Sequence, residues 1–202
     1  VVNEALNEDG TLRQSLWYKI IGPDYIAKAF EYAHEADPKV QLTYNDYNLA
    51  NPAKLAGVIR LVKQLKAQGV PIDCVGIQDH DHLDSPTPEQ EDNAIRSIAA
   101  LGVKVAISEL DINVLPGPGQ GNTAEVSMHM ASDPKWNPWP NGLPQDVQQK
   151  LTDQYVALFR VFYKDRADIS RVTFWGVTNA QSWLNNWPIP GRTNYPLLFD
   201  RE

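Results

Sequence analysis

The stretch IDCVGI at residues 72–77, followed by a helical pattern over 87–101 and then by VKVAI at 103–107, decides the fold. The first and last of these segments are short apolar runs, which indicate strands. Between them, Thr87 is a residue type that caps a helix and Gly102 is one that ends it. A strand, a helix and a strand in this order predict a parallel β-α-β unit.

The same alternation extends from this unit toward both ends of the chain. The further predicted elements are strands over 1–2, 40–44 and 172–175 and helices over 23–34, 52–68 and 145–163. Five strands alternating with four helices predict an α/β fold with a parallel sheet flanked by helices. A closed (β/α)8 barrel has eight of each. A doubly wound open sheet is the structural alternative, but no Gly-rich phosphate loop follows any of these strands.

Charge and composition disfavour several classes of partner. The chain has 25 acidic and 18 basic residues and a formal net charge of −7, whereas nucleic-acid-binding proteins usually carry a basic face. No apolar run approaches the roughly 20 residues of a membrane helix, so neither nucleic acid nor a membrane is predicted as a partner. The single Cys74 rules out a disulfide within the chain and is expected to be a buried thiol. Six Trp and eight Tyr, several of them in loops, suit the apolar faces of sugars.

Polar or aromatic side chains follow each predicted strand at its C-terminal end. They are Asn3-Glu4, Asn45-Asp46, Gln78-Asp79-His80, Glu109 with Asp111, and Trp175. In barrel enzymes the active site is built from the C-terminal ends of the strands and the loops after them. Any one of these residues could equally be structural, but five successive strands that deliver such groups to one rim indicate a site. The long loop over 113–144 is either a lid or rim of a cleft or a structural excursion.

Glu4 and Glu109 are the two carboxylates that this arrangement would bring to one cleft. Glycosidic cleavage needs one carboxyl group that protonates the leaving oxygen and one carboxylate that attacks the anomeric carbon or activates water. A separation of roughly 5–5.5 Å gives retention and roughly 6.5–9.5 Å gives inversion, and the sequence does not supply that distance. Spacing alone leaves open the alternative that either residue pairs with a Lys or Arg at the surface.

Six motifs resemble, in order and spacing, those of the glycoside hydrolase family 10 endo-β-1,4-xylanases. They are VVNEAL (1–6), NDYN (45–48), Gln78-x-His80, SELDI (108–112), WGVTNAQSW (175–183) and NYPLLFD (194–200). The resemblance covers essentially the whole chain. It implies a (β/α)8 TIM barrel in which residues 1–202 are the C-terminal portion of a single catalytic domain, from the end of strand 4 to strand 8. Strands 1 to 3 and the final helix of the family fold are absent.

The resemblance also implies a role for each residue of the site. Glu4 would be the acid/base, and Glu109 would be the nucleophile that forms a covalent glycosyl-enzyme. Asn3 would bind the 2-hydroxyl of the sugar, while His80 and Asp111 would orient and tune Glu109. An ionised carboxylate is favoured by hydrogen bonds to its charged form, which makes the last two roles physically reasonable.

Four further residues match family positions that contact sugar. Gln78 and Tyr47 match polar contacts, and Trp175 and Trp183 match the aromatic pair that walls the site near the cleaved bond. The departures from the family pattern are Asn179 and Gln181 within WGVTNAQSW and the extra Asp81, His82 and Asp84 after His80. These departures put the detailed substrate specificity in doubt more than the cleavage reaction.

These observations predict a retaining endo-β-1,4-xylanase that uses no cofactor. The acidic segment 79–84 does not have the spacing of a recognised metal site. The alternatives are a related β-1,4-glycanase, acting on mixed-linkage glucan or cellobiosides, and a non-catalytic half-barrel that needs its N-terminal complement. The expected partners are xylan or xylo-oligosaccharides and the N-terminal half of the same barrel. Because a polymer does not enter cells easily, the protein is expected to be secreted or periplasmic.

Overall fold

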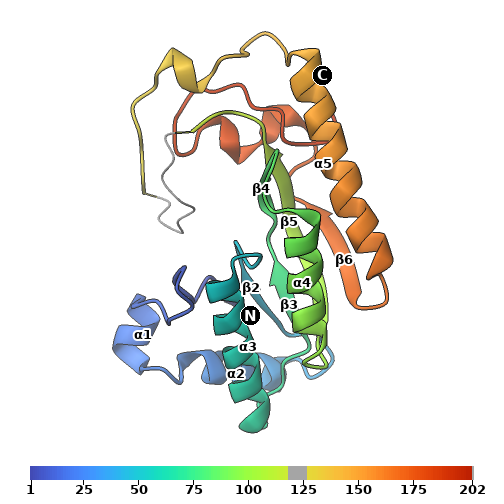
Figure 1. Cartoon of the computed structure of the whole chain (residues 1–202). Coiled ribbons are helices and arrows are strands. Elements are labelled where there is room, and N and C mark those ends of the chain that lie inside the picture. The colour runs from blue at the N-terminus through green and yellow to red at the C-terminus, as the bar shows by residue number, and fades with distance from the viewer. Residues whose placement is uncertain (118–126, 202) are drawn as a thin grey trace.

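The computed structural model describes residues 1–117 and 127–201, which form a parallel sheet with helices packed along it (Figure 1). The elements are β1 (Val2–Asn3), α1 (Leu16–Ile21), α2 (Tyr25–Ala36), β2 (Thr43–Asp46), α3 (Pro52–Ala67), β3 (Cys74–Ile77), β4 (His80–His82), α4 (Pro88–Ala99), β5 (Lys104–Asn113), α5 (Gln145–Lys164) and β6 (Ile169–Phe174), with short 3-10 helices at Pro134–Trp136, Asn179–Gln181 and Trp183–Asn185. The strands lie in the order β1-β2-β3-β5-β4, β6 also pairs with β5, and each of these pairings is parallel. The predicted parallel β-α-β succession is confirmed.

The strands differ from the prediction in number and extent. Strand β5 runs to Asn113 instead of ending at Ile107, and the unpredicted β4 pairs with its second half. Strand β6 begins at Ile169, before the predicted range 172–175. The prediction followed apolar runs, but the ladder is made by backbone groups, which continue to pair where the side chains become polar.

Helix α1 was not predicted, because six residues are too few to show a periodic pattern. Ser15 caps it: the side-chain oxygen accepts a hydrogen bond from the backbone N–H of Tyr18 at 3.2 Å. The other helices begin and end within two residues of their predicted bounds.

The helices that follow one another in the chain also pack on one another. Helix α3 contacts α4, and α4 contacts α5, as the succession from teal through green to orange in Figure 1 shows. Neighbours that succeed each other along one face of a sheet are the arrangement of a barrel, whereas a doubly wound sheet carries helices on both faces. The packing therefore favours part of a barrel over the open alternative.

Each long helix turns an apolar face to the sheet. Phe30 of α2, Val62 of α3, Ile95 of α4 and Leu158 of α5 are completely buried, and so are nearly all residues of β3. Burial of a side chain of this size stabilises the fold by about 1.5–3 kcal/mol. This core fixes the positions of the strand ends and hence of the polar groups that follow them.

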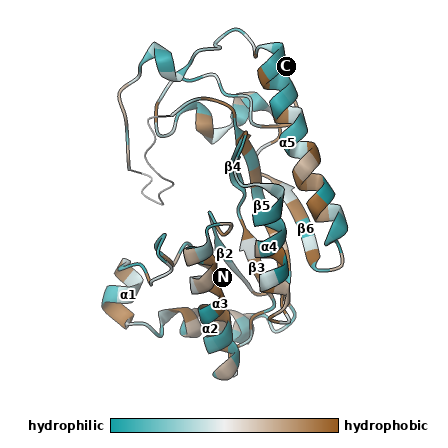
Figure 2. Cartoon of the chain, viewed as in Figure 1, coloured by the Kyte–Doolittle hydropathy of each residue, from teal (hydrophilic) through white to brown (hydrophobic). Residues whose placement is uncertain are grey.

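Apolar side chains remain exposed beside both outer strands. Leu16, Trp17 and Ile20 of α1 are 73%, 65% and 78% exposed, and α1 carries brown, apolar residues in Figure 2. Val177 and Phe199, which follow β6, are 67% and 64% exposed. Within the described residues, β1 pairs only with β2 and β6 only with β5, so both strands have an open edge; the short β4 also pairs with β5 alone.

Cys74 is buried in β3 and has no disulfide, as predicted. None of the described helices combines the length and the apolar character that crossing a bilayer requires.

Candidate active site

Asn45, the third residue of β2, links the ends of three strands. Its side-chain N–H group donates to Asn3 Oδ1 at 2.7 Å and to Glu109 Oε1 at 2.8 Å. Asn45 reaches across β3 because Gly76 lies directly opposite it, and a Cβ atom on Gly76 would stand only 2.2 Å from Asn45 Oδ1. Ser108 donates to the same Oδ1 at 2.6 Å, which fixes the orientation of the amide.

Glu4 follows β1 in a left-handed backbone conformation, with a φ of 52°, which is uncommon for a residue other than glycine. Gln78 Nε2 donates to Glu4 Oε1 at 3.0 Å and lies 3.3 Å from Asn3 Oδ1. Arg13 donates to the backbone carbonyl of Glu4 at 2.9 Å, and its guanidinium lies 3.8 Å from the carboxylate. Both side chains are partly exposed, so this ion pair is weak.

A continuous chain of hydrogen bonds therefore joins the two glutamates, running from Glu109 through Asn45, Asn3 and Gln78 to Glu4. Asn3, Glu4, Asn45 and Gln78 lie at or just after the C-terminal ends of β1, β2 and β3, as predicted, whereas Glu109 lies in the middle of the longer β5. Glu109 has no Lys or Arg partner among the described residues, and Glu4 has only the weak contact with Arg13. The alternative of a surface ion pair therefore fails for Glu109, whereas Glu4 does have a partly exposed arginine partner.

His80 lies between two carboxylates. Its Nε2 is 3.3 Å from Glu109 Oε2, and its Nδ1 is 2.9 Å from Asp111 Oδ1. The other oxygen of the fully buried Asp111 accepts from Trp183 Nε1 at 2.7 Å. Burial lowers the pKa of His80, but the hydrogen bonds to Asp111 and Glu109 outweigh it and raise the pKa to about 9. At neutral pH the imidazole is thus a cation that donates to both carboxylates.

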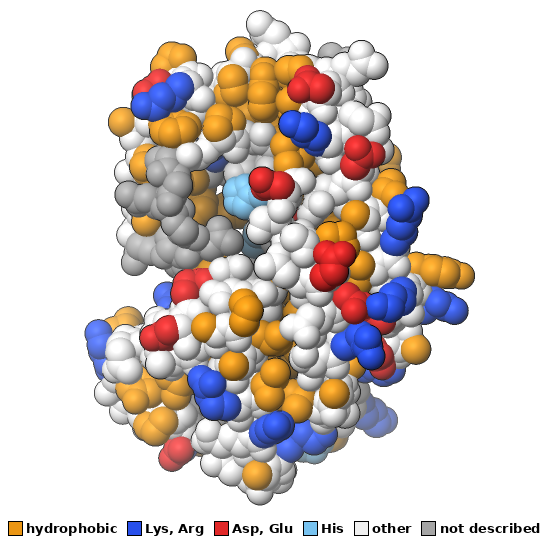
Figure 3. Space-filling view, in the orientation of Figure 1, with side chains coloured by type: hydrophobic (Ala, Val, Ile, Leu, Met, Phe, Trp, Pro, Cys, Tyr) orange, Lys and Arg blue, Asp and Glu red, His pale blue; other side chains and the backbone are white. Residues whose placement is uncertain are grey.

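Aromatic rings flank His80. The centroid of Trp183 lies 5.0 Å from that of His80 and the centroid of Trp175 lies 6.4 Å from it. Trp187 stacks behind Trp183 at 5.0 Å. Trp175 is 46% exposed, so its ring presents an accessible apolar face near Glu109, which suits a sugar ring. In Figure 3 the surface is hollowed between the part that carries α1–α3 and the part above it, and a histidine side chain is visible in the hollow.

Tyr47 lies on the side of the site nearer to Glu4, but only 8% of it is exposed. Its ring packs over the ammonium of Lys54, which stands 3.2 Å from the ring centroid. Burial and the nearby negative charges of Glu8 and Asp46 raise the pKa of the Tyr47 hydroxyl. Any contact with a ligand would involve the small exposed part of this residue.

Three carboxylates near His80 are buried, and none of them has a Lys or Arg partner among the described residues. Asp79, Asp81 and Glu91 are 4%, 5% and 0% exposed, and each has at least one oxygen without a hydrogen-bond partner. Burial, reinforced for the two aspartates by the charge of Glu91, raises all three pKa values, that of Glu91 to about 7. Across the described ranges, no three His, Cys, Asp or Glu side chains converge closely enough to hold a metal ion.

The remaining departures from the family pattern lie outside the hydrogen-bond chain. Asn179 is buried, and its Oδ1 accepts from the backbone N–H of Leu197, which is a structural role. Gln181, His82 and Asp84 are exposed.

The loop over 113–144 falls partly outside the described residues, because 118–126 are not among them. In the described part, Trp139 packs against the core, and its carbonyl accepts from Tyr195 at 3.0 Å. This part of the loop is therefore structural, while its predicted role as a lid or rim remains a prediction.

Sequence reasoning placed Asn45 at the rim without giving it a role, and it missed Arg13. Asn45 stood out as a strand-end residue within NDYN, which was the available signal. Its side chain reaches Glu109 on β5 by crossing β3, and this is possible only because Gly76 of β3 has no side chain. Nothing in the sequence around Arg13 indicates that it turns back to the carbonyl of Glu4.

Comparison with known proteins gives one family and many relatives. The sequence model of glycosyl hydrolase family 10 matches residues 1–202. The chain is 48% identical over 202 residues to endo-1,4-beta-xylanase A of Xylanibacter ruminicola and 40% identical over 204 residues to a beta-1,4-xylanase of Dictyoglomus thermophilum. These matches cover the whole of this chain but 55% and 53% of those proteins. The chain thus spans about half the length of the curated relatives it matches.

Solved structures agree with this assignment. An endoxylanase retrieved from a sugarcane soil metagenome superposes with a TM-score of 0.96 at 48% identity, covering 100% of this chain and 58% of that one. The intracellular xylanase TsXylA of Thermoanaerobacterium saccharolyticum superposes with a TM-score of 0.80 at 39% identity, covering 99% of this chain and 52% of that one. These neighbours are (β/α)8 barrels, so the predicted fold, part of such a barrel, is confirmed.

Proposed function

The chain belongs to glycosyl hydrolase family 10, and from that premise we propose that it carries both catalytic carboxylates of a retaining endo-β-1,4-xylanase. Glu109 attacks the anomeric carbon while Glu4 gives its proton to the leaving glycosidic oxygen. A covalent glycosyl-enzyme forms, and the leaving sugar departs as an alcohol. Glu4 then takes a proton from water as the water attacks the same carbon, which frees Glu109 and gives a product of retained configuration.

The observation that carries this proposal is the hydrogen-bond chain from Glu109 to Glu4. Glu109 receives N–H groups from Asn45 and His80, and both contacts favour a carboxylate ready to attack. Among the described residues, the carboxylate of Glu4 accepts a side-chain hydrogen bond from Gln78 alone, and it has partial access to solvent. This freer setting suits a group that must lose and regain a proton in each cycle.

The substrate class rests on the relatives and on the composition of the rim. Relatives have been solved in complex with xylotriose and xylotetraose. In this chain, Trp175 and Trp183 supply apolar rings beside Glu109, and Asn3 and Gln78 supply amides between the two carboxylates. We assign Asn3 to the 2-hydroxyl of the sugar, where a hydrogen bond strengthens as the oxocarbenium-like transition state develops.

We propose that the rest of the same barrel is the partner that completes the site. A cavity of about 760 Å³ beside β1 is lined by Val2, Glu4, Trp17 and Tyr25 among others. It is mostly apolar and lies against the open edge of the sheet, where a further strand of a barrel would pack. The isolated 202-residue chain is therefore expected to be poorly soluble and inactive, and co-expression with the remaining part is expected to restore activity. Secretion or a periplasmic location remains a prediction that rests on the size of the substrate.

The test uses the full-length protein. The parent is expected to hydrolyse xylan in preference to cellulose, and the first product seen by NMR should have the β configuration. Azide should rescue Glu109→Ala and give a glycosyl azide of inverted, α configuration, because the small anion takes the place of the missing carboxylate. An α-configured first product from the parent, or no rescue of Glu109→Ala, would remove Glu109 from the role of nucleophile.

A further inference from the structure

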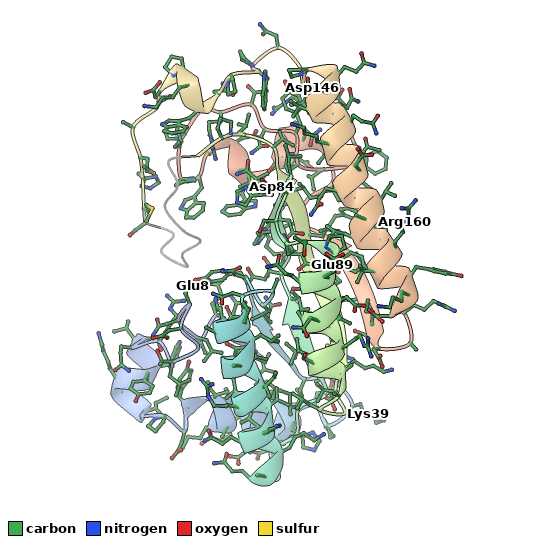
Figure 4. The ribbon with its side chains drawn as sticks, viewed as in Figure 1. Glu8, Lys39, Asp84, Glu89, Asp146 and Arg160 are labelled. Atoms are coloured by element: carbon green, nitrogen blue, oxygen red, sulfur yellow. The ribbon has the colours of Figure 1, made fainter. Side chains whose placement is uncertain are left out.

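Lys54, near the start of α3, has a completely buried ammonium group. Its Nζ lies 2.9 Å from Asp46 Oδ1, 3.1 Å from Glu8 Oε1 and 3.2 Å from the centroid of the Tyr47 ring. In Figure 4 the labelled Glu8 lies at the N-terminal end of α3, where Lys54 is. A buried ammonium is costly to desolvate and persists only when its partners are well placed. These partners lead back to Glu4 by two routes.

The first route runs through Asp46. The second oxygen of this carboxylate accepts a hydrogen bond from the hydroxyl of Tyr44 at 2.5 Å, and the same hydroxyl oxygen accepts from the backbone N–H of Ala5 at 3.2 Å. Tyr44 and Asp46 are completely buried. Ala5 directly follows Glu4, so the ammonium is connected through two side chains to the peptide that carries the acid/base.

The second route runs through Glu8, in the segment after Glu4. Besides Lys54, Glu8 accepts hydrogen bonds from the side chain of Asn48 and, at 3.5 Å, from that of Asn51. Further along this segment, Gly10 packs so closely on α3 that a Cβ atom on Gly57 would lie 2.6 Å from the Cα of Gly10. The segment is thereby held against the helix that carries Lys54.

Glu4 needs such support because of its backbone. A left-handed conformation of a non-glycine residue costs on the order of 1–3 kcal/mol and persists only where the surroundings determine it. The peptide groups around Glu4 are held by Asn45 at its N–H, by Arg13 at its carbonyl and by Tyr44 at the next N–H. Two of these three partners lie on β2, to which Lys54 is tied through Asp46.

On the basis of the proposed function, we propose that Lys54 is a positioning residue for Glu4, acting through Asp46 and Tyr44 on one side and through Glu8 on the other. Lys54 touches neither substrate nor the reacting atoms. Its loss would shift the proton donor away from the leaving oxygen and leave Glu109 in place. The defect should therefore depend on the leaving group: a sugar needs protonation to depart, whereas an activated phenolate does not.

The test compares two substrates in the full-length protein: a xylo-oligosaccharide and an aryl xylobioside with a strongly acidic phenol. Lys54→Met combined with Asp46→Asn removes the buried charge pair as a unit, which avoids leaving one charge unpaired. Its kcat/KM on the oligosaccharide is expected to fall by on the order of 100-fold, the effect of a displacement of ~1 Å in a reacting group. The value on the aryl xylobioside should fall by less than about 3-fold. Tyr44→Phe, which cuts only the link to Ala5, should shift the ratio in the same direction by about tenfold.

Tyr155→Phe is the matched control. It removes a buried hydroxyl of similar type, bonded to the carbonyl of Pro196 at 2.5 Å and remote from the links to Glu4, so the ratio should equal that of the parent. Equal losses on both substrates in the double variant, an unchanged ratio, or failure of the double variant to fold would each overturn the proposal. A parent inactive on both substrates would instead contradict the proposed function.

Discussion

The two carboxylates of the site stand in contrasting surroundings. Glu109 is 13% exposed and accepts from two side chains that are themselves anchored, Asn45 by Ser108 and His80 by Asp111. Glu4 is 24% exposed and accepts from one side chain, Gln78. Its position is set mainly through its backbone.

This difference follows from the places of the two strands. Glu109 lies within β5, which pairs with β3, β4 and β6, so neighbours surround it on both sides. Glu4 follows the two-residue strand β1, which pairs only with β2 among the described elements. A nucleophile must stay ionised and still, whereas an acid/base must exchange a proton with its surroundings. One rim thus supplies both environments. Variants of Glu4, of Glu109 and of their neighbours test this difference.

The largest effects are expected when either carboxylate is removed, and the two losses should differ in kind. Glu4→Ala should lower kcat/KM on xylan by about 10²–10⁴-fold, the usual contribution of general acid–base catalysis, and should spare much of the activity on aryl xylobiosides with activated leaving groups. Glu109→Ala should lose activity on both kinds of substrate, because the nucleophile is needed whatever departs. Steady-state kinetics on the two substrates distinguishes these patterns. Similar losses for Glu4→Ala on both would mean that the two carboxylates do not divide the work in this way.

The anchored side can be disturbed without touching either carboxylate. Gly76→Ala would place a methyl group against the amide of Asn45 and displace it from Glu109. We expect kcat on xylan to fall by on the order of 100-fold, with similar losses on activated substrates. Ser108→Ala is the milder control, because it removes a donor to Asn45 without pushing the amide aside. Near-parent kinetics of Gly76→Ala would show that Asn45 is not needed to hold Glu109.

The pH dependence of stability tests whether His80, next to Glu109, is positively charged. The pKa of His80 is raised from 6.5 to about 9, so its stabilising contribution is complete below pH 6.5 and is lost as the pH rises through 9. The free energy of unfolding should fall by about 3 kcal/mol over this interval for this residue. Denaturant titrations of the parent and of His80→Gln at pH 6 and pH 9.5 measure it. Equal pH dependence in both proteins would contradict a charged His80.

A second effect on stability, similar in size to that of His80, is expected at the buried Glu91. Its pKa is raised to about 7 by burial, so the folded state favours the protonated form and loses stability as the pH rises from 4.5 through 7. Glu91→Gln mimics the protonated carboxyl. It should match the parent at pH 4 and exceed it in unfolding free energy at pH 8 by about 3 kcal/mol. The exposed Glu89→Gln, two residues earlier in α4, is the control and should show no such gain. A variant less stable than the parent at pH 8 would show that the Glu91 carboxylate is paired.

Much of the site was visible in the sequence because functional groups follow strands at fixed places. The apolar runs located β1, β2, β3 and β5, and the residues after or within them include Asn3, Glu4, Gln78, His80 and Glu109. The motif resemblance added roles for Asp111 and Trp183, and both lie in contact with His80. Tyr47 was placed near the site, but its burial over Lys54 was not foreseen.

The sequence by itself determined the alternation of strands and helices, and hence which residues stand at the ends of parallel strands. The spacing of apolar residues that indicates a strand or a helix is a local property, so each segment shows it independently of the others. The tertiary structure alone decided that Asn45 reaches Glu109 across Gly76, that Lys54 is buried between Asp46 and Glu8, and that the buried Asp79 and Asp81 feel the charge of Glu91. Those relations depend on strand register and on packing between segments distant in the chain, which no single segment specifies.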